Sequence, residues 1–196
     1  MAAALNFPPE LLLRAQGQGL SMKAAIFDVD GVLTDGRLYV DEHGERVKAF
    51  STLDGHGLKL LARGGIEPVL ITGRDSAAVR RRVADLGIAH AIYGANDKLS
   101  AGESIRSLLG LEWPQIAVIG DDWPDLPLLA RAGFAAAPAN AHIEVRAIVD
   151  HVTGSAGGHG AAREFCDLLL VASGRYAALL QGHLTTLDDG SAAAPA

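Results

Sequence analysis

The sequence predicts an α/β protein whose parallel sheet lies between two layers of helices. Short apolar runs, each long enough for one buried strand, alternate with segments whose apolar residues recur at helical spacing. Continuous apolar strands are typical of parallel sheets, because helices cover both faces of such sheets. The 196 residues suffice for one such domain with a sizeable core and not comfortably for two.

Four strands are predicted from apolar runs that end in glycine or in a polar residue. They cover residues 24–27, 69–71, 91–93 and 116–119, and two weaker strands are expected at 134–137 and 148–149. Residues 38–40 and 47–50 flank Glu42-His43-Gly44, a pattern that predicts a β-hairpin with a glycine turn.

Helices are predicted between the strands. Asp75 is expected to cap a helix that ends at Gly87, and Asp97 a helix that ends at Gly110 with Leu108 among its inward residues. The remaining helices are expected at residues 57–63, 126–132, near Ile143 and at 160–172.

The chain is expected to have three parts. Residues 1–22 form an N-terminal extension with a short helix within 8–17, and residues 23–175 form the main domain. The last residues are small and polar, so 176–196 are expected to be a flexible C-terminal tail.

Charge and composition exclude several classes of partner. The net charge is −6 and the only dense cationic run, Arg80-Arg81-Arg82, fits a solvated helix face, so nucleic acid is not expected. No apolar run approaches the ~20 residues of a membrane helix, and residues 1–22 lack the pattern of a signal peptide. A single cysteine, Cys166, fits a reducing compartment, so a cytoplasmic location is expected.

Polar groups follow each of the four strong strands. They are Asp28-Val29-Asp30-Gly31, Thr72-Gly73-Arg74, Lys98, and Gly120-Asp121-Asp122 with Asp125 three residues later. In open α/β sheets the ligand lies beyond the carboxyl ends of the strands. The sequence therefore predicts that these groups share one site.

The residue types at this site indicate phosphoryl chemistry with a metal. Several converging carboxylates cannot all stay ionised without a cation, and oxygen ligands suit Mg²⁺. The Thr72 hydroxyl and the Lys98 charge are expected to bind a phosphoryl group beside the metal. Asp28 is then expected to be the nucleophile, and Asp30 to protonate the leaving oxygen and later to activate water.

Each residue also has a simpler interpretation. An aspartate after a strand often caps a helix or holds a turn. Thr72 could bond only the backbone, and Lys98 could be an exposed lysine. Arg74, a candidate for binding a substrate anion, could instead pair with a neighbouring helix. The ordered combination, with each motif after its own strand, favours the catalytic interpretation.

The ordered set resembles the four motifs of the haloacid dehalogenase superfamily, over residues 23–149. The resemblance implies that Asp28 is the phosphorylated nucleophile and Asp30 the acid/base, with Thr72 and Lys98 on the phosphoryl group. It also implies that Mg²⁺ is held by Asp28, the backbone carbonyl of Asp30, and Asp121. Asp122 and Asp125 would support the metal site.

Only about 40 residues separate the first two motifs, and the hairpin uses part of them. No separate lid domain fits there, so the chain resembles the capless subgroup. An open site leaves the reaction exposed to water. The capless sugar-phosphate phosphatases form tetramers in which a neighbour's hairpin and C-terminal tail close the site. The resemblance therefore implies a homotetramer.

A finer resemblance rests on the segments 27–36, 54–57, 71–74, 120–127 and 157–164, of which the last two are the more diagnostic. With the four motifs they resemble phosphatases that act on the 8-phosphate of an eight-carbon sugar acid in lipopolysaccharide precursor synthesis. This resemblance implies substrate contacts at five residues: Gly31, Gly73, Arg74, His56 and His159. Such enzymes commonly carry tyrosine at the position of His56 and arginine at that of His159. The two histidines could instead be plain residues of glycine-rich loops.

Two other functions stay open at this point. A related capless phosphatase could act on a nine-carbon sugar acid 9-phosphate or on other sugar phosphates. A phospho-accepting signalling domain also gathers aspartates, a threonine and a lysine around Mg²⁺. Such a domain lacks a second acid two residues after the phosphorylated aspartate, and here Asp30 occupies that position.

Overall fold

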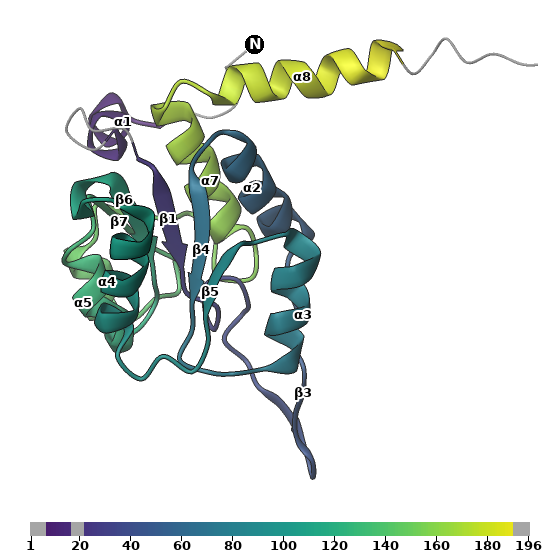
Figure 1. Cartoon of the computed structure of the whole chain (residues 1–196), viewed down its shortest axis with the longest axis vertical. Coiled ribbons are helices and arrows are strands. Elements are labelled where there is room, and N and C mark those ends of the chain that lie inside the picture. The colour runs from purple at the N-terminus through teal and green to yellow at the C-terminus, as the bar shows by residue number, and fades with distance from the viewer. Residues whose placement is uncertain (1–6, 17–21, 190–196) are drawn as a thin grey trace, which may run out of the picture.

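The computed structural model describes residues 7–16 and 22–189, and it confirms the α/β class. Six parallel strands form one sheet in the order β5-β4-β1-β6-β7-β8, with helices on both faces (Figure 1). The strands of this sheet are β1 (Ala24–Phe27), β4 (Glu67–Ile71), β5 (His90–Ile92), β6 (Ile116–Ile119), β7 (Phe134–Ala137) and β8 (His151–Val152).

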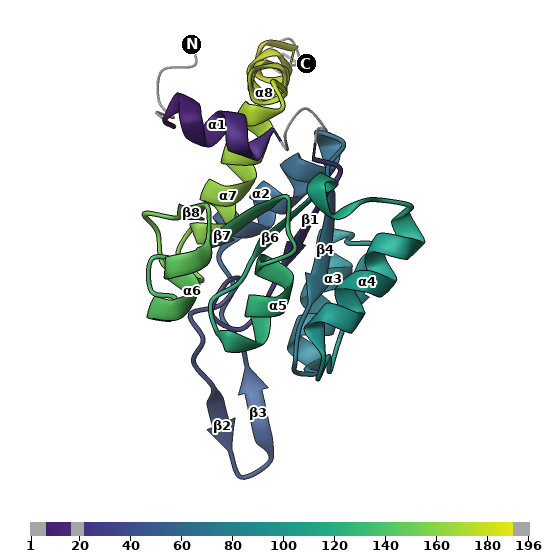
Figure 2. The same cartoon turned by 90° about the vertical axis from the view of Figure 1, so that its left-hand side faces the viewer.

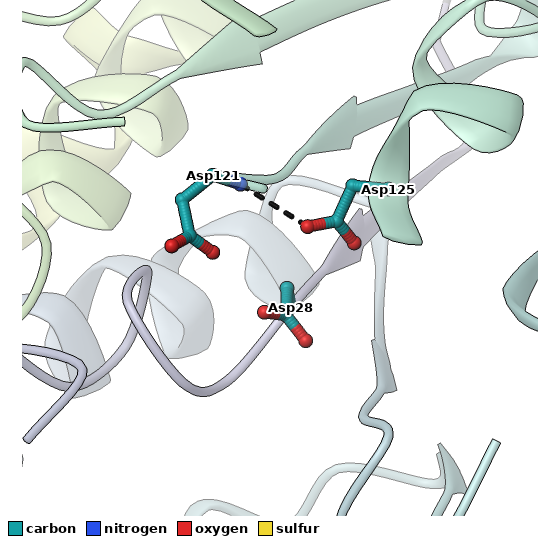
Figure 3. A group of neighbouring side chains, drawn as sticks. All are labelled: Asp28, Asp121 and Asp125. Atoms are coloured by element: carbon teal, nitrogen blue, oxygen red, sulfur yellow. Dashed lines mark hydrogen bonds between the residues drawn. The ribbon is translucent and has the colours of Figure 1, made fainter. Parts of the chain in front are cut away.

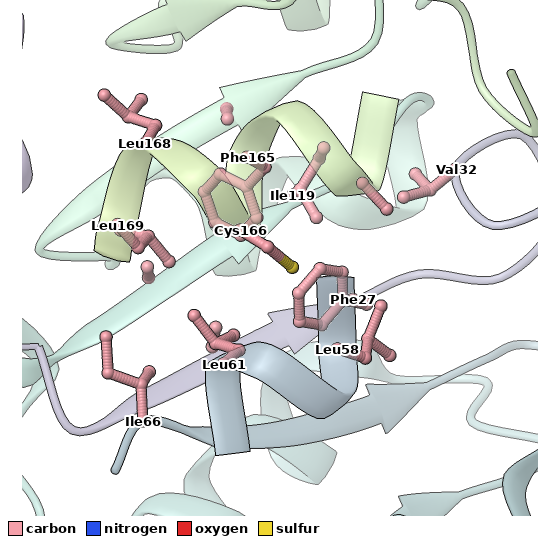
Figure 4. Packing of buried hydrophobic residues seen from close by; sticks show 14 of the residues in the cluster. Phe27, Val32, Leu58, Leu61, Ile66, Ile119, Phe165, Cys166, Leu168 and Leu169 are labelled. Carbon is pink, nitrogen blue, oxygen red and sulfur yellow. The ribbon is translucent and has the colours of Figure 1, made fainter. Parts of the chain in front are cut away.

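The helices divide between the two faces because side chains along each strand alternate. In β1, Ala25 and Phe27 face α2 (Thr52–Arg63), α3 (Ala77–Leu86) and α7 (Ala161–Ala172). Ala24 and Ile26 face α4 (Lys98–Leu109), α5 (Leu126–Leu129) and α6 (Ile143–Ile148). The Phe27 ring packs edge-on against Phe165 of α7, 5.5 Å between centroids (Figure 4). Burying one such side chain contributes roughly 1.5–3 kcal/mol, so both layers hold the strand ends in place.

The hairpin lies at the carboxyl end of the sheet. Strands β2 (Tyr39–Asp41) and β3 (Gly44–Val47) pair antiparallel and project beyond that edge (Figure 2). Gly44 takes φ +103° in the turn, a conformation that favours glycine. Since no other element is inserted between β1 and β4 before α2, the structure has no separate cap domain in its described part.

Helix α2 begins at Thr52, earlier than the predicted residue 57. The Ser51 side chain caps it by accepting a hydrogen bond from the Asp54 amide. The Asp54 carboxylate in turn accepts bonds from the amides of Gly160 at 3.3 Å and Arg163 at 2.8 Å. Gly160 has no side chain to cap α7, so Asp54 supplies the cap from another helix.

Three other local predictions are wrong. The residue at the N-cap position of α3 is Ser76, whose side chain makes no capping hydrogen bond, and both oxygens of Asp75 bind the Arg80 guanidinium at 2.7 Å. Leu108 is 68% exposed and does not face inward. The strand expected at 148–149 is absent, since α6 continues through Ile148 and the strand follows at 151–152.

Helices α1 (Pro9–Ala15) and α8 (Tyr176–Asp189) lie at the edge of the domain opposite the hairpin (Figure 2). Helix α1 confirms the short N-terminal helix, and its Ala15 is buried in the core beside α7. The predicted flexible tail begins instead as helix α8. Residues 1–6, 17–21 and 190–196 lie outside the described part, so the domain boundaries stay predictions. No helix among the described residues is long and apolar enough to cross a bilayer.

Candidate active site

A cavity of about 440 Å³ opens at the carboxyl edge of the sheet. It lies where the first, second and fourth predicted motifs meet, each directly after its strand, and where α4 begins. Its lining residues are Asp28, Asp30, Gly36, Gly73, Arg74, Ala95, Asn96, Lys98, Asp121, Asp122, Pro124 and Asp125. The structure therefore brings together most of the residues that the sequence assigns to one site.

Lys98 is the first residue of α4, and its ammonium lies between two carboxylates. The Nζ atom is 2.7 Å from Asp28 Oδ1 and 2.6 Å from Asp125 Oδ1. Its side chain is only 6% exposed, so the simpler interpretation as a surface lysine is wrong. Although burial opposes it, the two carboxylates raise the pKa of Lys98, which keeps the ammonium charged.

Asp125 holds the loop after β6. Its Oδ1 binds Lys98, and its Oδ2 accepts hydrogen bonds from the amides of Asp121 at 3.1 Å and Asp122 at 3.4 Å. Asp122 uses its own side chain to accept from the Trp123 amide at 2.8 Å. Asp125 thus orients the backbone that presents Asp121, and Asp122 holds the turn that follows; their supporting role at a metal site stays a prediction.

The site fits a hard divalent metal. Asp28, Asp121 and Asp125 each offer a carboxylate oxygen, and these oxygens lie within 4.8 Å of one another (Figure 3). Oδ1 of Asp121 is buried without a hydrogen-bond partner. Burial and the neighbouring carboxylates raise the pKa values of Asp28 and Asp121, although Lys98 opposes both shifts. One Lys98 charge does not offset three carboxylates, so an additional cation such as Mg²⁺ is what this oxygen-only donor set accommodates.

Asp30 and Arg74 lie at the rim of the cavity and both contact the hairpin. The Asp30 carboxylate pairs with Lys48, the residue after β3. Arg74 pairs with Glu45 of β3 at 3.0 Å, so its partner is the hairpin and not a neighbouring helix. Gly73 lines the cavity beside it.

Thr72 lies just beneath this surface, 1% exposed, and its hydroxyl oxygen accepts a hydrogen bond from the Arg74 amide at 3.3 Å. The backbone contact that the sequence left open for Thr72 is therefore present. That oxygen remains able to donate its own proton, so the predicted contact with a phosphoryl group stays a prediction.

Two glycine segments pack against each other below the cavity. A Cβ at Gly31 would lie 2.5 Å from Cγ of Asp121, and one at Gly157 would lie 2.5 Å from the carbonyl carbon of Gly31. Asn140 fixes the second segment by accepting from the Gly157 amide at 2.9 Å. The glycines thus permit the close approach that sets Asp28 to Gly31 against Asp121. Gly31 acts here by its lack of a side chain.

The structure does not bring His56 and His159 to this cavity. His56 lies in α2 and its ring is 5.6 Å from that of His183 in α8, beside a separate groove between α2, α7 and α8. The His159 amide donates to the carbonyl of Ala156 in the glycine-rich turn before α7. The geometry of one chain therefore does not support a substrate contact for either histidine.

Sequence reasoning missed Lys48 and Glu45. The hairpin was predicted, but its strands carry several charged residues and nothing in their order marks these two. Their side chains are 1% and 13% exposed, although they belong to a projecting element. A buried lysine flanked by two carboxylates is visible only after the hairpin is placed beside the sheet.

Comparisons with known proteins agree with this geometry. A model of haloacid dehalogenase-like hydrolases matches residues 94–165. A 3-deoxy-D-manno-octulosonate 8-phosphate phosphatase from Haemophilus influenzae is 44% identical over 155 residues, which are 79% of this chain and 86% of that protein.

Two solved structures are similar over most of the chain. A phosphatase of the same name from Moraxella catarrhalis, in complex with magnesium ion, phosphate ion and KDO, has a TM-score of 0.84 at 40% identity. The match covers 90% of this chain and 99% of that one. A probable yrbi family phosphatase from Pseudomonas syringae has a TM-score of 0.85 at 45% identity, over 90% and 98% of the two chains.

The fold and the cluster of aspartates around Lys98 define a phosphoryl-transfer enzyme of the haloacid dehalogenase type. The same-named relatives match 79–90% of this chain. The chain belongs to the family of 3-deoxy-D-manno-octulosonate 8-phosphate phosphatases within the haloacid dehalogenase-like hydrolases.

Proposed function

We propose that this protein is a Mg²⁺-dependent phosphatase that hydrolyses 3-deoxy-D-manno-octulosonate 8-phosphate to the free sugar acid and phosphate. The observation that carries the proposal is the buried cluster of Asp28, Lys98, Asp125 and Asp121 at the carboxyl edge of the sheet. The substrate is taken from the family, one of whose structures contains magnesium, phosphate and KDO.

The reaction proceeds in two steps, through a phosphorylated Asp28. An oxygen of Asp28 bonds to phosphorus, the bond to the sugar oxygen breaks, and Asp30 gives that oxygen its proton. A water oxygen then bonds to phosphorus, its proton passes to Asp30, and the bond to Asp28 breaks. When bound, Mg²⁺ would neutralise the carboxylates and polarise the phosphoryl oxygens.

The other residues of the site bind the phosphoryl group and the metal and orient them. The Lys98 ammonium lies against Asp28 at 2.7 Å, where it can stabilise negative charge on the transferring group. Thr72 supplies a hydroxyl from just beneath the cavity, and Arg74 supplies a planar cation at its rim. Asp121 is the ligand held ready for the metal by the loop that Asp125 fixes.

Phosphate release by the Asp28→Asn and Asp30→Asn variants tests the mechanism. Asp28→Asn removes the nucleophile and should abolish turnover. Asp30→Asn should slow release of the sugar by about 10²–10⁴-fold, the usual contribution of a general acid. Full activity in Asp28→Asn would exclude a covalent step, and full activity in Asp30→Asn would favour a phospho-accepting signalling domain.

A substrate panel tests the specificity. Values of kcat/KM for the eight-carbon acid 8-phosphate should exceed those for a nine-carbon acid 9-phosphate and for simple sugar phosphates. Equal values across the panel would refute the assignment of substrate and would leave a phosphatase of broad range.

We infer further that the active form is a homotetramer in the cytoplasm. The open cavity and the exposed apolar residues of the hairpin, Tyr39, Val40 and Val47, support an assembly in which another subunit covers the site. The unpaired, buried Cys166 is compatible with a reducing compartment. Light scattering coupled to gel filtration tests the assembly, and a monomer that is fully active would overturn it.

A further inference from the structure

Lys48 is the most deeply buried charged side chain of the hairpin. It follows β3, and its side chain is 1% exposed. The ammonium pairs with Asp30 Oδ1 and lies 3.2 Å from Glu45 Oε1. Glu45 in turn receives hydrogen bonds from Ser76 at 3.1 Å and from Arg74 at 3.0 Å. The hairpin is therefore tied to the site by a continuous chain of charged contacts that ends on the acid/base residue.

The contact with Lys48 gives the two oxygens of the Asp30 carboxylate different surroundings. Lys48 holds Oδ1, and within the described part of the chain no other side chain bonds to this carboxylate. Asp30 lines the cavity and its side chain is 21% exposed. The oxygen that Lys48 leaves free is thus the one available to exchange a proton with the leaving group or with water. A carboxylate without this anchor would rotate among several orientations.

Stability alone is a weak reason for a lysine in this place. A buried ammonium loses several kcal/mol of hydration, and well-packed apolar residues often replace a buried ion pair without loss. The hairpin is a two-stranded element, and its β2 residues and Val47 are exposed. Lys48 therefore contributes less to a core than to the geometry of the carboxylate it touches.

We infer that Lys48 is a positioning residue for the acid–base step, and that it makes the hairpin part of the catalytic machinery. This inference rests on the proposed function. Lys48 contacts neither Asp28 nor Asp121 in the structure, and it acts through the Asp30 carboxylate. It holds Asp30 while the leaving oxygen takes the proton, and again while water returns it.

The test uses leaving groups of different basicity. A sugar alkoxide is a poor leaving group and needs the proton from Asp30, whereas 4-nitrophenolate leaves without it. Lys48→Met should lower kcat for the sugar phosphate by about 10–100-fold, a part of the usual general-acid contribution, and change kcat for 4-nitrophenyl phosphate less than about 3-fold. Lys48→Arg, which keeps the ion pair, should recover most of the loss. Lys23→Met, at an exposed lysine directly before β1, is the control for the change in net charge.

The outcomes separate this inference from the function on which it rests. If Lys48→Met does not fold, Lys48→Gln retains a hydrogen-bond donor and is compared in the same way. An equal loss with both substrates, or no loss with either, overturns the positioning role. If the unmodified protein does not hydrolyse the sugar phosphate but does hydrolyse the aryl ester, the substrate assignment fails, and the leaving-group comparison is then made with alkyl and aryl phosphates.

Discussion

Replacing Gly157 with alanine tests whether the glycine-rich segment before α7 sets the geometry of the site. The added Cβ would lie 2.5 Å from the carbonyl carbon of Gly31, whereas real Cβ contacts stay beyond 3.0 Å. The obstacle is backbone, so no side-chain rotation relieves it. The Gly31 carbonyl oxygen would be closer still, so Gly31 or the segment must shift by more than about 1 Å, because packed interiors leave no spare space.

A shift of Gly31 would also displace the reacting groups of the site. Gly31 follows Asp30 directly and its Cα packs against the Asp121 carboxyl, so a displaced Gly31 moves both groups relative to Asp28. Misplacement of reacting groups by about 1 Å can lower the rate about 100-fold, which corresponds to about 2.7 kcal/mol of barrier. We therefore expect Gly157→Ala to reduce kcat/KM by about 30–100-fold and the free energy of unfolding by about 1–3 kcal/mol.

Gly154→Ala is the matched control in the same segment. Its Cβ would lie 3.7 Å from the nearest atom, Glu164 Oε2, which is an ordinary van der Waals contact. Steady-state kinetics and urea unfolding of the two variants measure the changes in kcat/KM and in the free energy of unfolding. If Gly157→Ala keeps kcat/KM within about 3-fold of Gly154→Ala, the coupling of this segment to the site is refuted.

Three further predictions concern stability, pH and metal. Asp54→Ala removes the cap of α7 and two hydrogen bonds, and urea unfolding should show a loss of about 2–4 kcal/mol; an unchanged midpoint contradicts this. Although burial opposes it, hydrogen bonds from His151, Gly154 and Ser155 lower the pKa of Glu164 below its usual 4.5. The stability that Glu164 contributes is then present above pH 4.5 and is lost as the pH falls through the lower pKa of the folded state. In thermal scans below pH 4.5, the difference in stability between the wild type and Glu164→Gln should therefore shrink. A difference in stability that does not change with pH would refute a contribution from the ionised Glu164 carboxylate. Chelation of Mg²⁺ should abolish turnover, and Mg²⁺ at 100 times its Kd should stabilise the protein by about 2.7 kcal/mol. Asp121→Asn should remove most of that thermal shift, and a full shift in this variant would exclude Asp121 as a ligand.

Strand positions and strand-end chemistry were predictable because both are local signals. The strands at 24–27, 116–119 and 134–137 have the bounds that the apolar runs indicated. Asp28, Lys98 and Asp121 meet because parallel strands end at one edge, a rule that holds without knowledge of packing. The Asp97 cap was also predictable, and its side chain accepts from the Ser100 amide.

Choices between neighbouring residues were not predictable in the same way. Asp75 and Ser76 are both residue types that favour the N-cap position, but Asp75 binds Arg80 and the Ser76 hydroxyl binds Glu45, so neither side chain caps α3. The start of α2 was placed late because Asp54, Gly55 and Gly57 look like a loop. Buried packing of α2 against α7 overrides the weak helix propensity of glycine.

The sequence by itself determined the fold class and the charged side chains that meet at the sheet edge, among them Asp28, Lys98 and Asp121. Each of these depends on residue type and on the order of motifs along the chain. Only the tertiary structure decided that Lys48 holds Asp30, that Asp54 caps α7, and that Gly157 packs on Gly31. These contacts join residues 18 to 126 positions apart, and such partners are chosen by how the layers pack, because a charged group or a glycine has no local signal for what it will touch.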